Sequence, residues 1–242
     1  MIAAESTLRS IALEKPATIR VFESLNLDYC CGGNRPLAEA CAQKGLDVDE
    51  VVASLTEAAH GGAPAVKDFS QAAPTELAHY IVKTHHGYVR NELPRLLAMA
   101  ERVARKHGPM HPEATQIERQ LTQLADELLM HMQKEEIVLF PYIEKLERRR
   151  NGSAQAPEAC FASVESPIRM MVHEHESAGA LMDAMRTATG GFRPWEGACP
   201  TTVGLYDGLD AFERDLHRHV HLENNVLFPA AIALEQEALA TQ

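Results

Sequence analysis

The residues best suited to bind metal ions in this chain are histidines and glutamates at a repeated spacing. Glu135 follows His131 by four positions, and Glu223 follows His219 by the same interval. The segment that starts at His131, HMQKEEIVLFP, returns 88 positions later as HVHLENNVLFP. Residues four apart on a helix project from the same face, so each His-x-x-x-Glu pair can present two ligands together. The repetition indicates two copies of one helix pair around a pseudo-twofold axis.

Each repeated motif also has a histidine upstream at a similar distance. His86 precedes His131 by 45 positions, and His175 precedes His219 by 44. By helical periodicity, His86, His175 and His219 share a face with apolar residues, so we expect them to be buried. The neighbouring histidines that lie on other faces, and are the weaker candidates, are His85, His173, His217 and His221. The sequence therefore predicts six metal ligands on four helices: His86, His131, Glu135, His175, His219 and Glu223.

A purely structural interpretation of these residues has to be weighed against metal binding. A single His-x-x-x-Glu motif is usually an exposed pair on a helix, and a single histidine on an apolar face is usually a hydrogen-bonded core residue. Six such groups on buried faces are different, because unpaired imidazoles and carboxylates are costly in a core. Bound metal ions would satisfy all six groups at once.

The number and type of these ligands indicate which metal they bind. Six ligands are too many for one tetrahedral zinc ion, and imidazoles argue against calcium or magnesium. Helical bundles that combine carboxylates with histidines commonly hold two redox-active ions. We therefore expect two non-haem iron ions, each with two histidines, bridged by the carboxylates of Glu135 and Glu223. Manganese is the second choice.

Four long segments with helical periodicity carry these residues. They run roughly over residues 75–106, 112–148, 167–189 and 201–237, and each begins near a proline, which is favoured in the first turn of a helix. No segment shows the competing alternation of a β-strand. We therefore predict an all-α protein, in which residues 74–242 form an antiparallel four-helix bundle.

The first sixty residues are expected to form a small helical domain of their own. Short helical patterns at about 17–25, 36–44 and 48–59 are separated by glycine-containing stretches. Residues 61–73 contain glycines and prolines, and we interpret them as a linker between the domain at 1–60 and the bundle.

The small domain contains the adjacent cysteines Cys30 and Cys31, followed by Gly32 and Gly33. Adjacent cysteines do not easily form an unstrained disulfide, and the glycines allow the backbone to approach another group closely. Two such thiols can bind iron, react with nitric oxide species or cycle through oxidation. The alternative is two small buried residues at a turn. The predicted metal site favours thiol chemistry, whereas Cys41, Cys160 and Cys199 have no comparable sequence context.

The bulk composition excludes several classes of partner. The net charge of −11 argues against nucleic acid and against anionic membrane surfaces, since both select basic patches. The chain opens without the pattern of a signal peptide, and no apolar run reaches the length of a transmembrane span. The five cysteines are an odd number, which favours reduced thiols over a disulfide framework. These observations predict a cytoplasmic protein.

The motifs together resemble the hemerythrin-like repair-of-iron-centres family over essentially the whole chain. His86, His131, Glu135, His175, His219 and Glu223 match the di-iron ligands of that family, and Asp28-Tyr-Cys-Cys-Gly-Gly resembles the signature of its amino-terminal domain. Glu127 and Glu174 resemble acidic residues that lie close to the iron centre. Oxygen-carrying hemerythrins have a fifth histidine and a different carboxylate pair, so the resemblance does not favour oxygen carriage.

The resemblance implies repair of iron–sulfur clusters damaged by nitrosative or oxidative stress, through a supply of iron. The partners would be damaged iron–sulfur proteins, with nitric oxide or dioxygen as small ligands. The alternative is a protein that binds nitric oxide, or reduces it to nitrous oxide, at the same ligands. The sequence does not distinguish these functions or determine the oligomeric state, and a homodimer is compatible with it.

Overall fold

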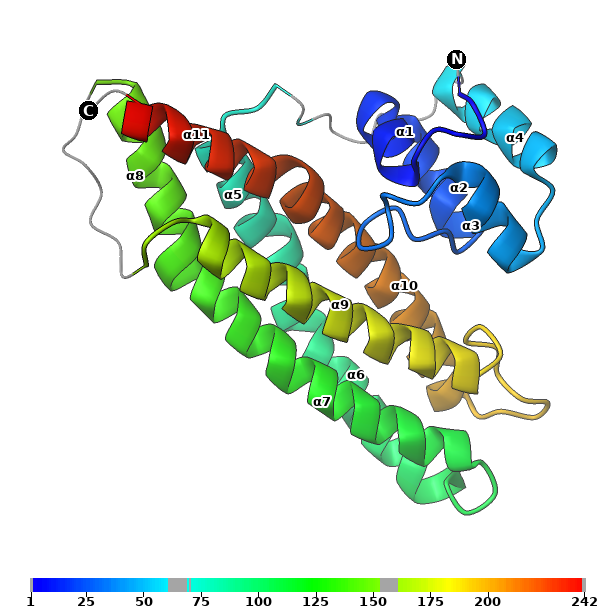
Figure 1. Cartoon of the computed structure of the whole chain (residues 1–242). Helices are drawn as coiled ribbons and strands as arrows, with labels where there is room; N and C mark the ends of the chain where they lie inside the picture. The colour runs from blue at the N-terminus through cyan, green and yellow to red at the C-terminus, as the bar shows by residue number, and fades with distance from the viewer. Residues whose placement is uncertain (1, 61–68, 70, 153–160, 241–242) are drawn as a thin grey trace. The chain divides into compact units, whose positions relative to one another are not determined.

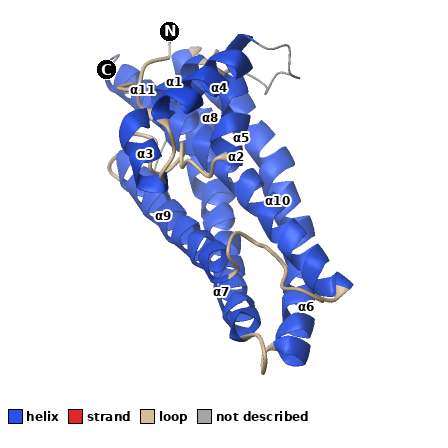
Figure 2. Ribbon diagram, turned by 90° about the vertical axis from the view of Figure 1, so that its right-hand side faces the viewer, coloured by secondary structure: helices blue, strands red, loops and turns tan. Residues whose placement is uncertain are grey.

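The computed structural model describes residues 2–60, 69, 71–152 and 161–240. Every named element within these ranges is helical, which confirms the prediction of an all-α protein (Figure 2). None of the helices in these ranges is long and apolar enough to cross a membrane. Most of the predicted linker, residues 61–73, lies outside the described ranges.

Backbone contacts divide the chain into two compact units. The larger consists of Pro74–Leu216 and Ala231–Gln242, and the smaller of Met1–Ala73 and His217–Ala230. The last long helix therefore contributes to both units. The domain boundaries expected from the sequence stay a prediction, and each unit is described separately below.

From Pro74 onward the chain forms long helical rods, of which the first three lie in the larger unit and the fourth contributes to both units. The first rod is α5 (Pro74–Ile81), η2 (Val82–His86) and α6 (Gly87–His107), and the second is α7 (Pro112–Lys134), η3 (Glu135–Leu139) and α8 (Phe140–Arg150). The third is α9 (Glu165–Ala188), and the fourth is α10 (Pro200–Leu222), η4 (Glu223–Leu227) and α11 (Phe228–Ala240). Figure 1 shows α6, α7 and α9 side by side. The four rods agree with the predicted ranges to within three residues at each end.

The apolar pattern of α7 shows why these helices pack together. Its buried residues are Ala114, Ile117, Leu121, Leu124, Ala125, Leu128, His131 and Met132. Steps of three and four residues keep them on one face of a helix. His131 continues this stripe, so the periodicity that builds the core also directs an imidazole into it.

Three short segments of these rods are π-helical rather than α-helical. They are η2, η3 and η4, and each begins or ends at a proposed metal ligand: η2 at His86, η3 at Glu135 and η4 at Glu223. A π-turn adds one residue to a helical turn and is frequent at functional sites. The sequence periodicity predicts continuous α-helices here, so the widened turns are a finding of the structure.

The amino-terminal part of the smaller unit is a cluster of short helices. They are α1 (Leu8–Glu14), the 3₁₀ turn η1 (Pro16–Thr18), α2 (Ile19–Ser24), α3 (Leu37–Lys44) and α4 (Val48–His60). Their core includes Leu8, Phe22, Tyr29, Leu37 and Leu55, all less than 2% exposed. The helix α1 was not predicted. Its start is fixed by Thr7, whose hydroxyl accepts a hydrogen bond from the amide of Ser10 at 3.1 Å.

Candidate metal centre

The six predicted ligands meet in two groups of donor atoms. One group consists of His86, Glu135, His219 and Glu223, and the other of His131, Glu135, His175 and Glu223. Within each group the donor atoms all lie within 4.8 Å of one another. Glu135 and Glu223 belong to both groups, whereas each histidine belongs to one. The arrangement provides two neighbouring candidate cation sites with two imidazoles each and two shared carboxylates.

All six side chains are buried. The exposed fraction is 0% for His86, Glu135 and Glu223, 1% for His219, and 2% for His131 and His175. Ionised carboxylates and several imidazoles removed from water are costly unless charges of opposite sign stabilise them. Bound cations supply that charge, so the donor set fits a pair of metal ions.

The carboxylate of Glu135 contacts histidines of both groups. Its Oε1 lies 3.3 Å from Nε2 of His131, and its Oε2 lies 3.4 Å from Nε2 of His86. One oxygen thus faces each site, as a bridging carboxylate requires. On the other repeat, Nε2 of His219 and Oε1 of Glu223 lie 2.9 Å apart.

Carboxylates contact the Nδ1 atoms of two of these histidines. Nδ1 of His131 lies 2.9 Å from Oε2 of Glu174, and Glu174 also forms an ion pair with Lys134. Nδ1 of His86 lies 2.6 Å from Oε1 of Glu136. A carboxylate at Nδ1 fixes the ring and directs Nε2 toward a metal.

The outer carboxylate Glu136 is also paired with a cation, because Arg90 lies 2.7 Å from the same oxygen. Burial raises the pKa of Glu136, but the hydrogen bonds from His86 and Arg90 outweigh it and lower the pKa overall. Burial likewise raises the pKa of Glu174, and contacts with Lys134 and His131 lower it overall. Both groups are therefore carboxylates at neutral pH.

The outer carboxylates differ in part from those expected. Glu174 contacts His131, one of the proposed ligands, and its role beside the metal stays a prediction. Glu127 instead contacts Nε2 of Gln123 at 2.8 Å and Oγ of Ser177 at 3.0 Å. Its expected role near the metal stays a prediction. Glu136, which directly follows Glu135 and contacts His86, was not among the residues predicted from the sequence.

Two of the weaker candidate histidines are buried, contrary to what their place outside the apolar faces indicated. His85 and His221 are each 4% exposed, yet neither belongs to the two donor groups. Nδ1 of His85 lies 3.0 Å from Oδ1 of Asp215. Nδ1 of His221 lies 2.9 Å from Nδ2 of Asn225, and burial lowers the pKa of His221 to about 4. By contrast, the side chain of His173 is 83% exposed.

The family model of the hemerythrin HHE cation binding domain matches residues 77–231, which span all six proposed ligands. The chain belongs to this family. A second family model, a domain of unknown function (DUF542), matches residues 4–59. The family resemblance inferred from the sequence is thereby confirmed.

Two curated relatives of this hemerythrin-domain chain cover almost its whole length. The iron-sulfur cluster repair protein YtfE of Pectobacterium carotovorum subsp. carotovorum (strain PC1) is 37% identical over 94% of this chain and 97% of the relative. The protein of the same name from Escherichia coli O1:K1 / APEC is 35% identical over 96% of this chain and 98% of the relative. Both predicted domains therefore have counterparts in these relatives.

In the segment that the second family model matches, Asp28 organises the cysteine loop. Its Oδ1 accepts hydrogen bonds from the amides of Cys30 and Cys31, both at 3.0 Å, and its Oδ2 accepts one from the amide of Gly32 at 2.8 Å. The Cys30 thiol donates to the same Oδ1 at 3.1 Å. A Cβ at Gly33 would lie 2.5 Å from the carbonyl oxygen of Tyr29, so this position requires glycine.

The two cysteines of this loop differ in environment. Cys30 is 5% exposed and Cys31 is half-buried, with the sulfur atoms 3.9 Å apart and no disulfide between them. The hydrogen bond with Cys31, burial and the charge of Asp28 all raise the pKa of Cys30 well above its usual value. Cys30 is therefore a protonated thiol, and Cys31 is the accessible one.

Within the smaller unit, the loop contacts the helix segment that carries His219 and Glu223. Nδ2 of Asn225 donates to the carbonyl oxygen of Tyr29 at 3.3 Å, and the rings of Tyr29 and His221 lie 5.2 Å apart. Nearby, Arg218 forms a two-point ion pair with Glu23 at 2.6 and 2.7 Å. His221 and Asn225 thus have a structural role that does not require metal.

A further cysteine has an environment that its sequence context did not reveal. Cys199 directly precedes α10, and its sulfur lies 3.4 Å from the hydroxyl of Thr202. Hydrogen bonds from the side chain and amide of Thr202, with a smaller contribution from His107, lower the pKa of the Cys199 thiol to about 6. The sequence feature that could have indicated this low pKa is the position of Cys199 directly before Pro200, the first residue of α10.

Proposed function

We propose that this protein repairs iron–sulfur clusters damaged by nitrosative or oxidative stress, by supplying iron from its hemerythrin domain. The observation that carries the proposal is the pair of four-donor groups that share Glu135 and Glu223. Such a set suits two ions of one kind held close together. The two relatives described above carry the name of iron-sulfur cluster repair proteins, which supports the same function.

The six ligands have distinct proposed roles in holding this iron. His86 and His219 would hold one ion, His131 and His175 would hold the other, and the carboxylates of Glu135 and Glu223 would be shared by both. Glu174 orients His131, and Glu127 is proposed to act in the surroundings of the centre. Ferrous ions held there would supply iron for transfer and would offer positions for small ligands such as nitric oxide or dioxygen. Two carboxylates leave part of the charge of two ferrous ions uncompensated, which suits release of the iron.

The amino-terminal thiols are proposed to handle iron or nitric oxide species outside the centre. Cys31 is the accessible thiol, and the buried Cys30 supports it through the contact between the two sulfurs. This assigns residues 1–60 to thiol chemistry and residues 74–242 to metal binding. The proposed partners are damaged iron–sulfur proteins, and the location is the cytoplasm, where free thiols persist.

The test mixes anaerobic di-ferrous protein with a protein whose iron–sulfur cluster has lost iron. The expected result is transfer of iron and recovery of the cluster absorption. A parallel sample receives nitric oxide, and nitrous oxide is measured. If nitrous oxide forms and no iron is transferred, the proposal of cluster repair is replaced by the alternative function, the reduction of nitric oxide. A variant with Cys30→Ser and Cys31→Ser should keep its iron, because all six proposed ligands are unchanged. It should lose iron transfer, because the proposed thiol chemistry is removed.

A further inference from the structure

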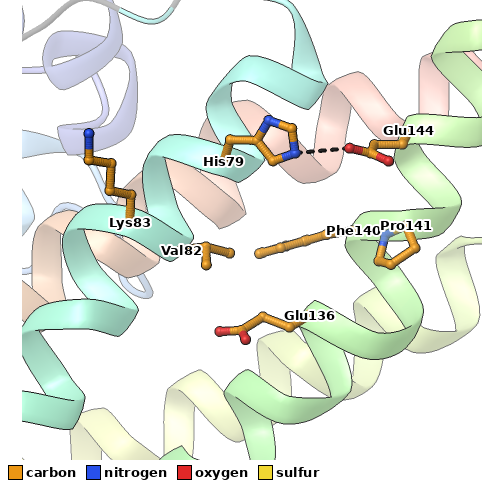
Figure 3. Close-up of a pocket in the computed structure, with 7 residues that line it drawn as sticks. All are labelled: His79, Val82, Lys83, Glu136, Phe140, Pro141 and Glu144. Carbon is orange, nitrogen blue, oxygen red and sulfur yellow. Dashed lines mark ion pairs between the residues drawn. The ribbon is translucent and has the colours of Figure 1, made fainter.

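A surface pocket lies next to one of the proposed iron ligands. Its volume is about 400 Å³. It opens between α5 and η2 on one side and η3 and α8 on the other (Figure 3). The lining residues used below are His79, Val82, Lys83, Glu136, Phe140 and Glu144.

The inner wall of the pocket consists of two side chains that touch His86. The ring of Phe140 stacks on the imidazole of His86, with 5.9 Å between ring centroids and an interplanar angle of 17°. The carboxylate of Glu136 contacts Nδ1 of the same imidazole at 2.6 Å. His86 itself is fully buried. One layer of side chains therefore separates the pocket from a proposed iron ligand.

The polar groups of the pocket are of the types that bind ferrous iron. Nε2 of His79 and Oε1 of Glu144 lie 2.9 Å apart at the outer edge, where their side chains are 69% and 25% exposed. Figure 3 shows this pair on one side of Val82 and Phe140, with Glu136 on the other. The ammonium group of Lys83 points away from all three (Figure 3). Imidazole and carboxylate groups suit divalent first-row metals.

The other outer carboxylate provides an internal comparison. Glu174 contacts Nδ1 of His131 at 2.9 Å and pairs with Lys134, just as Glu136 contacts His86 and pairs with Arg90. Of these two carboxylates, Glu136 lines the pocket and Glu174 does not. The two proposed ligands are thus held in the same way, and this pocket lies beside the carboxylate that contacts His86.

We propose that this pocket is the port through which iron enters and leaves the centre, and that its imidazole and carboxylates hold a divalent cation in transit. The inference rests on the di-iron function proposed above. An entering ferrous ion meets His79 and Glu144 first. Glu136 receives it at the inner wall when its hydrogen bond with His86 opens. Release follows the reverse order.

The experiment measures iron exchange in the full-length protein rather than repair. Val82→Trp places a large ring in the pocket. The di-ferrous protein is mixed with excess bipyridine, and the coloured complex is followed by stopped flow. Separately, the metal-free protein is mixed with ferrous ion. Both exchange rates should fall several-fold, whereas the iron content at equilibrium should stay the same.

The matched control is Val138→Trp. Val138 lies on η3, is 37% exposed and does not line the pocket, so its substitution should leave both rates unchanged. A second variant combines His79→Gln with Glu144→Gln at the exposed edge. It should slow loading at low ferrous concentration without altering the helices.

Three outcomes decide the proposal. Wild-type exchange rates in Val82→Trp would overturn it. If that variant does not fold, normal loading of the His79→Gln, Glu144→Gln variant would overturn it equally. Slow exchange in both variants supports the port even if the protein fails to repair clusters. The port and the proposed function can therefore fail independently.

Discussion

The Nε2 atoms of His131 and His175 lie 3.0 Å apart, although the residues are on different helices, α7 and α9. Both rings are buried, and their planes meet at 61°. Two imidazole nitrogens at about this distance can bind one metal ion, because each ring then presents the lone pair of its Nε2. The same two rings, with Glu135 and Glu223, form one of the two donor groups.

The first prediction follows from this division of donors between two groups. His175→Ala removes one imidazole from the group that contains His131, and leaves the group of His86 and His219 complete. Iron content per chain, measured by elemental analysis, should fall by about half, because the remaining donors no longer close that site. The control is His173→Ala on the same helix, whose side chain is 83% exposed. Equal iron loss in both variants would contradict the assignment.

The second prediction concerns the carboxylates behind the histidines. Glu136→Ala and Glu174→Ala should each weaken ferrous binding about 10- to 100-fold, because His86 and His131 lose the contacts that orient them. The affinity is measured by competition with a chelator. Glu127→Ala is the comparison, since Glu127 contacts Ser177 and Gln123. A loss as large as that of Glu174→Ala would instead place Glu127 in the expected role near the metal.

The sequence was sufficient to predict the bundle because burial follows a period of three and four residues. In α7 that period runs from Ala114 through Leu121 to His131, so the core and a ligand are predicted by one pattern. The same pattern separated His175 from His173. His175 is 2% exposed as a residue, whereas the side chain of His173 is 83% exposed, so the two histidines lie on different faces of the helix.

The sequence was insufficient where the geometry depends on tertiary contacts. Periodicity assumes a regular helix, so it does not show that η3 widens at Glu135 and brings Glu136 to His86. Periodicity places His221 outside the apolar face. The structure nevertheless buries it, because its partner Asn225 contacts the carbonyl of Tyr29, which is distant in the sequence. The helix α1 is only seven residues long, too short for a clear periodic pattern.

The third prediction separates the two adjacent thiols. In the metal-free protein at neutral pH, iodoacetamide should alkylate Cys31 well before Cys30. Cys30 is 5% exposed and donates its hydrogen to Asp28, and its raised pKa keeps it protonated. The rates are measured by mass spectrometry on the single variants Cys30→Ser and Cys31→Ser. Asp28→Asn should accelerate alkylation of Cys30, because the nearby negative charge is removed.

The last prediction uses the lowered pKa of Cys199. A thiol reacts with iodoacetamide as the thiolate, which forms as the pH rises through its pKa. With a pKa of about 6, the alkylation rate of Cys199 should rise between about pH 5 and pH 7 and be constant at higher pH. Cys41 is buried and its pKa is raised, so its rate should still increase at pH 9. Both rates are read from the same digest by mass spectrometry.

The cause of this low pKa can be tested separately. The hydroxyl of Thr202 makes the largest contribution, and its side chain is fully buried. Thr202→Val keeps the shape and removes the hydrogen bond, so the thiolate loses stabilisation and the rate profile of Cys199 should move to higher pH. Thr201→Val is the matched control, because Thr201 acts on Cys199 through its backbone. An unchanged profile in Thr202→Val would show that the helix amides and His107 suffice to hold the thiolate.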